Sequence, residues 1–307
     1  MTRQTESQFA DALAQCATVG DALAFGEQAL AGADVFLGHG TDSYHDEAVM
    51  LLLHALSLPW DVDPAVANEP LTDDARQRFA GLLVQRIDAR MPAPYLTHQA
   101  WFCGLPFYVD ERVLIPRSPI AELIEVGFAP WVDPDRVTRV LDLCTGGGCI
   151  AIACAHAFPE ADIDATDIDA DALAVCQRNI DDYGLNARVH ARQGDGLAAA
   201  RGRYDIIVSN PPYVDAEDMA SLPPEYRHEP EHALASGDDG LDFTRQLLRQ
   251  AADYLADDGI LVVEVGNSME AVEQVWPQVP FTWVEFERGG HGVFLLTRSQ
   301  LLEHFPG

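Results

Sequence analysis

A run of strand-forming residues in the middle of the chain stops abruptly at two consecutive prolines. Residues 204–208 are mostly β-branched or aromatic, which is the pattern of a buried strand. Asn210, Pro211, Pro212 and Tyr213 follow after one serine. Because a proline pair cannot continue the hydrogen-bonded ladder of a sheet, the chain must turn there. We therefore predict that Asn210 lies at the carboxyl end of a strand, where open α/β sheets bind their ligands.

The predicted turn presents two hydrogen-bond acceptors. The side-chain amide of Asn210 offers an acceptor oxygen as well as donors, and the carbonyl oxygen of Pro211 is free to accept. The proline rings fix the backbone so that both oxygens can face one small target, and Tyr213 can supply a flat wall. This arrangement suits the binding of an –NH2 group. An ordinary turn after a strand is the alternative, since Asn-Pro pairs commonly open turns.

Upstream of this turn, a glycine loop joins a predicted strand to an apolar helix within residues 139–153. Gly146–Gly148 would let the backbone approach a ligand closely, and the helix points its N-terminus at the same place. The spacing Gly-x-Gly-x-x-Gly is not met, because residue 149 is Cys and residue 151 is Ala. This departure counts against a pyrophosphate-binding, nicotinamide-dependent oxidoreductase and favours an adenosine ligand without phosphates.

Two further predicted strands end in acidic residues. The strand over 161–166 is followed by Asp167, about twenty residues past the glycine loop, where a carboxylate can accept hydrogen bonds from ribose hydroxyls. The strand over 187–192 is followed by Asp195. We therefore expect acidic groups at two strand ends of the same sheet.

Taken together, residues 142–148, Asp167 and residues 210–213 resemble the motifs of class I S-adenosyl-L-methionine-dependent methyltransferases. They occur in that order at the ends of predicted strands one, two and four. The Asn-Pro-Pro-Tyr element resembles the variant found in enzymes that methylate planar nitrogens, either exocyclic amines of nucleobases or the side-chain amide of glutamine. The resemblance implies an α/β fold with a Rossmann-like seven-stranded methyltransferase sheet.

The remaining chain predicts a small all-α N-terminal domain and a β-hairpin connector before that sheet. Helical periodicity runs to about residue 90, and Pro92-Ala93-Pro94 is expected to break the last helix and begin the connector. Residues 101–109 predict two short strands around a turn at Gly104-Leu105-Pro106. The predicted domains are 1–92 for substrate recognition, 93–119 as connector and 120–307 for cofactor binding and catalysis.

Over its whole length this architecture resembles the protein glutamine-N5 methyltransferases. Within that family, residues 114–124 and 224–231 are similar to the branch that acts on large-subunit ribosomal protein L-three. The branch that acts on peptide chain release factors typically has Arg-Pro-Asp-Thr-Glu after the Ile-Pro pair. The catalytic motif does not separate the two branches, so methylation of release factors stays the alternative.

The resemblance implies a role for each motif residue. Asn210, Pro211 and Tyr213 are the candidate catalytic residues, and with Pro212 they form the candidate substrate site. The candidate residues for S-adenosyl-L-methionine, and for the product S-adenosyl-L-homocysteine, are Asp142, Cys144, Thr145, Gly146, Gly147, Gly148, Asp167, Asp195 and Asn210. Asp167 would bind the ribose hydroxyls and Asp195 the adenine amino group.

The charge of the chain indicates its partners. Its formal net charge is -30, and all 19 basic residues are Arg. Nucleic-acid affinity depends on neutralising phosphates with Lys and Arg, so direct nucleic-acid binding is not expected and a DNA adenine methyltransferase is disfavoured. A basic ribosomal protein is an electrostatically suitable substrate. A lysine-free, Asp-rich surface is also typical of proteins that work at high ionic strength, where self-repulsion is screened.

Several other functions are disfavoured by what the chain lacks. The six cysteines include no Cys-x-x-Cys pair, so we expect no metal site. We expect no membrane association and a cytoplasmic protein, because the first residues have no signal-peptide core and no apolar stretch is long enough to span a bilayer. A non-catalytic adenosyl-binding assembly factor is the remaining alternative, and the intact acceptor motif disfavours it.

Overall fold

The chain divides into two compact units. The structure, a computed structural model, describes residues 2–306, with side chains from residue 7 onward. One unit holds the residues up to Gln99 together with Pro223–His228, and the other holds Ala100–Leu222 and the residues from Glu229 onward. Assignment of Pro223–His228 to the N-terminal unit was not predicted, because those residues follow the Asn-Pro-Pro-Tyr motif in the sequence.

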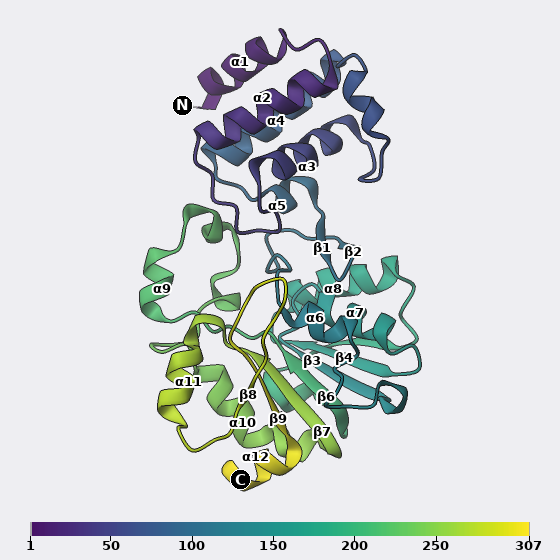
Figure 1. The fold of residues 1–307 in the computed structure, drawn as a ribbon, viewed down its shortest axis with the longest axis vertical. Coiled ribbons are helices and arrows are strands. Elements are labelled where there is room, and N and C mark those ends of the chain that lie inside the picture. Colours follow the sequence, from purple (N-terminus) through teal and green to yellow (C-terminus); the bar gives the residue numbers. More distant parts are fainter. Residues whose placement is uncertain (1, 307) are drawn as a thin grey trace. The chain divides into compact units, whose positions relative to one another are not determined.

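The first unit is helical (Figure 1). Its helices are α1 (Thr2–Leu13), α2 (Val19–Gly32), α3 (Tyr44–Leu56), α4 (Asp73–Asp88) and α5 (Ala93–Thr97). Thr18, Ser43 and Thr72 cap α2, α3 and α4 by accepting a backbone N–H with their side-chain oxygens. The apolar faces of these helices share one core that includes the fully buried Leu51 and Phe79. Capping residues and an apolar face therefore explain why each segment is helical.

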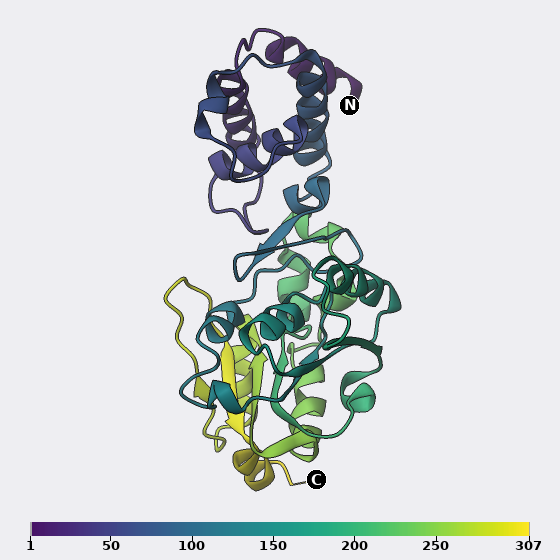
Figure 2. The ribbon, with the colours of Figure 1, turned by 90° about the vertical axis from the view of Figure 1, so that its right-hand side faces the viewer.

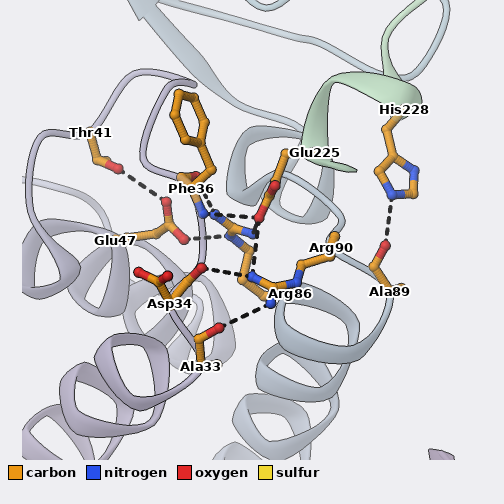
Figure 3. A network of polar contacts seen from close by, with 10 residues as sticks. All are labelled: Ala33, Asp34, Phe36, Thr41, Glu47, Arg86, Ala89, Arg90, Glu225 and His228. Carbon is orange, nitrogen blue, oxygen red and sulfur yellow. Dashed lines mark hydrogen bonds and ion pairs between the residues drawn. The ribbon is translucent and has the colours of Figure 1, made fainter. Parts of the chain in front are cut away.

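A buried arginine forms the polar centre of this unit (Figure 3). Arg86 of α4 is 1% exposed, and its Nε donates to Glu47 Oε1 at 2.5 Å. Its Nη1 donates to Glu225 Oε1 at 3.2 Å, and its Nη2 donates to the carbonyl oxygen of Phe36 at 2.8 Å. Glu225 also accepts the backbone N–H of Phe36 at 3.0 Å. The guanidinium thus satisfies two buried carboxylates that would otherwise be costly to remove from water.

The other residues of Pro223–His228 add contacts within the same unit. His228 Nε2 lies 2.8 Å from the carbonyl oxygen of Ala89 (Figure 3). The ring of Tyr226 packs against that of His39, with their centroids 4.6 Å apart. An ion pair, a hydrogen bond and a ring contact therefore hold this short segment among the N-terminal helices.

The second unit is built on a mixed sheet. Within the described residues, seven strands pair in the order β5-β4-β3-β6-β7-β9-β8, and the pairs involving β9 are antiparallel. The strands are β3 (Arg139–Leu143), β4 (Asp162–Asp167), β5 (Val189–Gln193), β6 (Tyr204–Ser209), β7 (Leu255–Glu264), β8 (Thr282–Trp283) and β9 (Val293–Thr297). The predicted fold class and the buried strand before the proline pair are confirmed.

Helices cover both faces of this sheet, as Figures 1 and 2 show. One face packs on α6 (Ile120–Glu125), α7 (Cys149–Ala157) and α8 (Ala170–Asp182), and the other on α10 (Asp242–Tyr254), α11 (Met269–Val275) and α12 (Arg298–His304). Adjacent residues of one strand enter opposite cores: Ile206 and Val208 face the first set of helices, and Ile207 faces the second. Burial on both faces explains the nearly continuous apolar sequence of the central strands.

The prediction that the helix before Pro92-Ala93-Pro94 is broken there is confirmed, since α4 ends at Asp88. A short helix after these prolines was not predicted: Pro94 lies in the first turn of α5, where a missing N–H has no intrahelical partner to lose. The predicted position of the hairpin turn, at Gly104-Leu105-Pro106, was wrong. The hairpin of β1 (Ala100–Phe102) and β2 (Leu105–Phe107) turns at Cys103-Gly104, both with positive φ, and Pro106 lies inside β2. A two-stranded ribbon has an open edge that tolerates proline.

The acidic stretch that follows the Asn-Pro-Pro-Tyr motif, residues 214–240, contains short helical elements. It forms α9 (Ala216–Ser221) and the 3-10 turns Pro224–His228 and Glu231–Ala233. Asp215 caps α9 by accepting the backbone N–H of Asp218. No helix in the described part of the chain is long and apolar enough to cross a bilayer.

Removal of the Glu225 carboxylate is expected to destabilise the helical unit. The substitution Glu225→Ala leaves Arg86 buried without one of its two anions, which typically costs about 3–5 kcal/mol. The control Asp74→Ala removes an ion pair with Arg78 on the exposed face of α4, worth below about 1 kcal/mol. Native-state hydrogen exchange of the backbone amides in α3 and α4 measures the loss of stability in each variant. Equal losses of stability in Glu225→Ala and Asp74→Ala would contradict this role of Glu225.

Candidate active site

Four neighbouring strands end at one edge of the sheet with a functional group. Leu143 of β3 pairs with Thr166 of β4 and with Ser209 of β6, and Ser209 pairs with Val263 of β7. Because these strands are parallel and in register, the residues that follow come side by side. At this edge lie Asp167 and Glu264, the last residues of β4 and β7, and Cys144 and Asn210, the first residues after β3 and β6.

These strand ends open onto a cavity within the second unit. Two of the predicted cofactor residues, Gly146 and Asp167, line it together with Asn210 of the Asn-Pro-Pro-Tyr motif. The full lining is Arg112, Val113, Leu114, Cys144, Gly146, Asp167, Ile168, Ala172, Asn210, Pro212, His232 and Ala233. The structure therefore brings the glycine loop, the acidic strand end and the acceptor motif to one place.

The glycine loop turns over this cavity with unusual backbone angles. Cys144, Gly146 and Gly148 all have positive φ, at 58°, 53° and 83°. A Cβ at Gly148 would lie 2.7 Å from Cys176 Sγ, so glycine is required there for packing. A Cβ at Gly146 would meet nothing within 4 Å, so the open side of this residue can be approached by a ligand. The Gly146 N–H donates to Asp167 Oδ2 at 2.9 Å, which joins the loop to the acidic strand end.

Asp142 lies buried beneath the loop. It is 0% exposed, and its Oδ2 accepts the hydroxyl of Thr145 at 2.5 Å and the backbone N–H of Ala151 at 3.0 Å. Burial raises the pKa of this carboxyl to about 7, against an ordinary value of 3.8, and the nearby charge of Asp167 adds to the shift. Asp142 and Thr145 thus pair with each other under the loop and do not line the cavity.

The other predicted site residues take different positions. Pro211 is buried, and Pro212 lines the cavity beside Asn210. Tyr213 is half-buried and donates its hydroxyl to Glu264 Oε1 at 2.9 Å. Asp195 is exposed just after β5. Gly147, which is buried, accepts the side-chain amide of Asn179 with its carbonyl oxygen. Of these residues, only Pro212 contributes to the cavity wall.

Part of the cavity wall was not predicted. Arg112, Val113 and Leu114 come from the segment before α6, and His232 and Ala233 come from the acidic stretch after α9. Only Leu114 lies within a stretch that the sequence had singled out, at the start of residues 114–124. His232 was not predicted, because about nineteen residues separate it from the Asn-Pro-Pro-Tyr motif and only the packing of that stretch brings it to the cavity.

The two stretches that indicated the ribosomal-protein branch contact each other. Arg117 donates to both carboxylate oxygens of Glu229, at 2.6 and 2.8 Å, and Glu229 also accepts the backbone N–H of Ile115 at 2.9 Å. Glu229 is 5% exposed. A paired, buried carboxylate of this kind fixes geometry, because the planar guanidinium matches it at two points. The stretch before α6 and the end of the acidic stretch are therefore locked together.

The cavity suits an adenosine ligand better than a phosphate ligand. Among its described lining residues the basic ones are Arg112 and His232. Arg112 is paired with Asp110, and His232 Nε2 lies 3.1 Å from Asp169 Oδ2. The other polar side chains of the lining include the partly exposed carboxylate of Asp167 and the amide of Asn210. Hydroxyl groups and a flat ring fit these partners, whereas phosphates would lack an unpaired cation.

Comparison with known proteins gives full-length relatives. A ribosomal protein uL3 glutamine methyltransferase of Neisseria gonorrhoeae is 48% identical over 96% of this chain and 99% of its own length. Proteins of the same name from Neisseria meningitidis serogroups B and A are also 48% identical, over 96% of this chain and 97% of their own length. The chain belongs to this glutamine methyltransferase family. The resemblance inferred from its motifs is confirmed, and the protein is a methyltransferase.

Other comparisons match shorter regions of the chain. The methyltransferase small domain family matches residues 128–224. The crystal structure of the hMettl16 catalytic domain in complex with MAT2A 3′UTR hairpin 6 has a TM-score of 0.49 and 17% identity, covering 75% of this chain and 84% of that chain. A methyltransferase from Pyrococcus furiosus has a TM-score of 0.46 and 18% identity, covering 64% and 89%. Family membership rests on the full-length relatives alone.

The raised pKa of Asp142 predicts a specific pH dependence of stability. Between about pH 4 and pH 7 the folded protein holds a proton on Asp142 that the unfolded chain releases, so this contribution to the free energy of unfolding falls as pH rises. Asp142→Asn is neutral throughout. Relative to that variant, the wild type should lose up to about 4 kcal/mol across this range.

Denaturant unfolding followed by tryptophan fluorescence checks this difference, since the second unit holds four of the five tryptophans. Taking the difference between the two proteins at each pH cancels the contributions of the other acidic residues. A difference that stays constant from pH 4 to pH 7 would show that Asp142 is ionised in the folded protein.

Proposed function

We propose that the protein transfers the methyl group of S-adenosyl-L-methionine to the side-chain amide nitrogen of a glutamine in ribosomal protein uL3, the L-three protein of the large subunit. The observation that carries this proposal is that Asn210 shares one cavity with Gly146 and Asp167. An acceptor group for an amide thus lies beside groups suited to a nucleoside. The names of the full-length relatives support the same substrate.

The cofactor would be held by the glycine loop and the neighbouring strand ends. Asp167 would accept hydrogen bonds from the ribose hydroxyls, and Asp195 would accept the adenine amino group. Gly146 offers an open backbone face for close approach. Asp142 and Thr145 support the loop from below, through the hydrogen bonds that they and Ala151 form. When bound, the cofactor supplies an electrophilic methyl group on a cationic sulfur.

Asn210 and Pro211 would position the glutamine amide. The lone pair of an amide nitrogen is delocalised into its carbonyl, so the nitrogen is a poor nucleophile. The side-chain oxygen of Asn210 and the carbonyl oxygen of Pro211 would accept its two N–H groups and fix its direction, while Tyr213 would limit its movement as a flat wall. Positioning and charge placement supply most of the acceleration in such a site. No general base is needed before transfer, because the proton leaves the nitrogen afterwards.

The charge of the chain supports a basic protein as the substrate. The net charge of -30 favours association with a cationic partner and opposes binding to nucleic acid. The helical unit is our candidate for substrate recognition, and the acidic segment of α9 is a second candidate. We place the reaction in the cytoplasm, where ribosomal proteins are synthesised.

Asn210→Ala tests the role of the acceptor motif. Transfer to the glutamine should be nearly abolished, because the amide loses the partner that orients it, while affinity for S-adenosyl-L-methionine should stay largely intact. Asn186→Ala, an exposed asparagine outside the cavity lining, is the matched control and should keep full activity. Single-turnover methylation and calorimetric cofactor binding measure the two effects, and a loss of cofactor affinity in Asn210→Ala would contradict the assigned role.

The substrate is tested by a transfer assay with labelled cofactor. Free uL3 and a peptide chain release factor are offered in parallel, and mass spectrometry locates the methyl group. Methylation of a uL3 glutamine alone supports the proposal. Methylation of the release factor alone would keep the chemistry and overturn the substrate, because both substrates present the same amide to the Asn-Pro-Pro-Tyr motif.

A further inference from the structure

A segment that begins with the last residue of β7 surrounds Tyr213 of the Asn-Pro-Pro-Tyr motif. We call residues 264–268, Glu-Val-Gly-Asn-Ser, the tyrosine cradle. Tyr213 donates its hydroxyl to Glu264 Oε1 at 2.9 Å, and its carbonyl oxygen accepts the hydroxyl of Ser268 at 2.8 Å. The cradle therefore holds the residue at its two polar ends, although it is separated from Tyr213 by about fifty residues of sequence.

The ring of Tyr213 also lies directly on the backbone of the cradle. A Cβ at Gly266 would lie 2.5 Å from Tyr213 Cε2 and 2.9 Å from its Cζ, closer than any side chain could be accommodated without movement. Gly266 has a φ of 46°, which further favours glycine. The hydroxyl, the ring face and the carbonyl of Tyr213 are thus restrained from separate directions by one five-residue segment.

Two other glycines close the cradle from behind. The carbonyl oxygen of Gly292 accepts the backbone N–H of Val265 at 2.7 Å and that of Gly266 at 3.2 Å, and a Cβ at Gly292 would lie 2.2 Å from the Gly266 carbonyl oxygen. A Cβ at Gly240 would lie 2.1 Å from Ser268 Oγ and 2.3 Å from the Tyr213 carbonyl oxygen. Close packing on this scale leaves the cradle little freedom to shift.

Glu264 links this cradle to the stretch before α6. The carboxylate is 5% exposed, and its second oxygen, Oε2, accepts the hydroxyl of Ser118 at 2.5 Å. Burial raises the pKa of Glu264, while its two hydroxyl donors and the charges of Arg117 and His291 act in the opposite direction. Burying a carboxyl group at this position costs free energy. If the ring of Tyr213 served only to fill space, no buried carboxyl group would be needed beside its hydroxyl.

We propose that the tyrosine cradle is a positioning element of the methyl-transfer site, with Glu264 as its positioning residue. Glu264 acts through the hydroxyl of Tyr213: it holds the ring at a fixed angle, so that the turn from Asn210 to Tyr213 keeps its acceptor oxygens directed at one target. Asn210 at the start of this turn follows Ser209, whose hydroxyl donates to the Leu143 carbonyl oxygen. The turn is thereby restrained at both ends, one by the sheet and one by the cradle.

The kinetic test of this proposal rests on the proposed function, because it measures kcat for methyl transfer to the glutamine amide. If Tyr213 acts on the substrate amide, Tyr213→Phe and Glu264→Gln should each lower kcat by about ten- to a hundred-fold, as small misplacements in such sites do. The cofactor Kd should change by less than about two-fold, because neither side chain lines the cavity. Tyr213→Phe removes the hydroxyl donor, and Glu264→Gln replaces the buried carboxyl acceptor with an amide oxygen, so both variants act on the same hydrogen bond. The double variant should therefore be no less active than the less active single variant.

Glu285→Gln is the matched control. It changes an exposed glutamate of the same unit that lies outside the cavity and the cradle, and it should keep the wild-type kcat. Tyr213→Phe guards against misfolding, because it removes one oxygen atom and keeps the ring on Gly266. Wild-type kcat in Tyr213→Phe, or losses that simply add in the double variant, would overturn the positioning role.

Hydrogen exchange supplies a readout that needs no substrate. The backbone amides of Tyr213 and Val214 should exchange faster in Glu264→Gln and Tyr213→Phe than in the wild type or in Glu285→Gln. If wild-type protein fails to methylate uL3, the proposed substrate is wrong, and this exchange pattern still decides whether the cradle restrains the turn. Unchanged exchange in both variants would overturn the cradle itself.

Discussion

The end of the backbone hydrogen-bond ladder after β6 is the constraint on which the site depends. Two prolines cannot extend the ladder, so the chain leaves the sheet at Ser209 and presents Asn210 at its edge. Because β3, β4, β6 and β7 are parallel and in register, the residues after each strand arrive at that same edge. The glycine loop, Asp167, Asn210 and Glu264 are neighbours for this reason, despite their separation along the chain.

A second constraint is the handling of buried negative charge in a very acidic chain. Each buried carboxylate has its own set of donors. Asp142 takes a hydroxyl and a backbone amide, Glu264 takes two hydroxyls, and Glu225 and Glu229 take arginine guanidinium groups together with a backbone amide. Arginine is the only basic residue type besides histidine in this sequence, and its planar fork suits these paired sites. Glu225, Glu229 and Glu264 thereby join segments that are distant in sequence.

The stretch after the Asn-Pro-Pro-Tyr motif shows most clearly how buried carboxylates connect distant parts of the chain. Glu225 is held by Arg86 among the N-terminal helices, and Glu229, four residues later, is held by Arg117 in the second unit. One short run of chain therefore contributes to both compact units. The loop that follows the acceptor motif is fixed by two ion pairs and not left as a free connector. A methyltransferase that must direct a weak nucleophile benefits from such restraint, since its acceleration depends on positioning.

Residues close in sequence made most of the architecture predictable. Runs of β-branched and aromatic residues, the glycine loop and the proline pair predicted the central strands, the helix of Cys149–Ala157 and the turn after β6. Proline positions misled where context decides their effect: Pro94 lies in the first turn of a helix and Pro106 lies within a strand. The short helix α9 was missed because its six residues carry too little periodicity to be recognised.

The sequence by itself determined the fold class, the buried strand that stops before the proline pair and the acidic strand end, because these depend on local backbone chemistry. Only the tertiary structure decided which distant residues complete the site. His232 in the cavity wall, the contact between Arg117 and Glu229, and the enclosure of Tyr213 by Glu264, Gly266 and Ser268 depend on how loops pack together. Such contacts join segments that are distant in sequence and share no repeating pattern of apolar residues. Their geometry is set by close packing and by the need of each buried polar group for a hydrogen-bond partner.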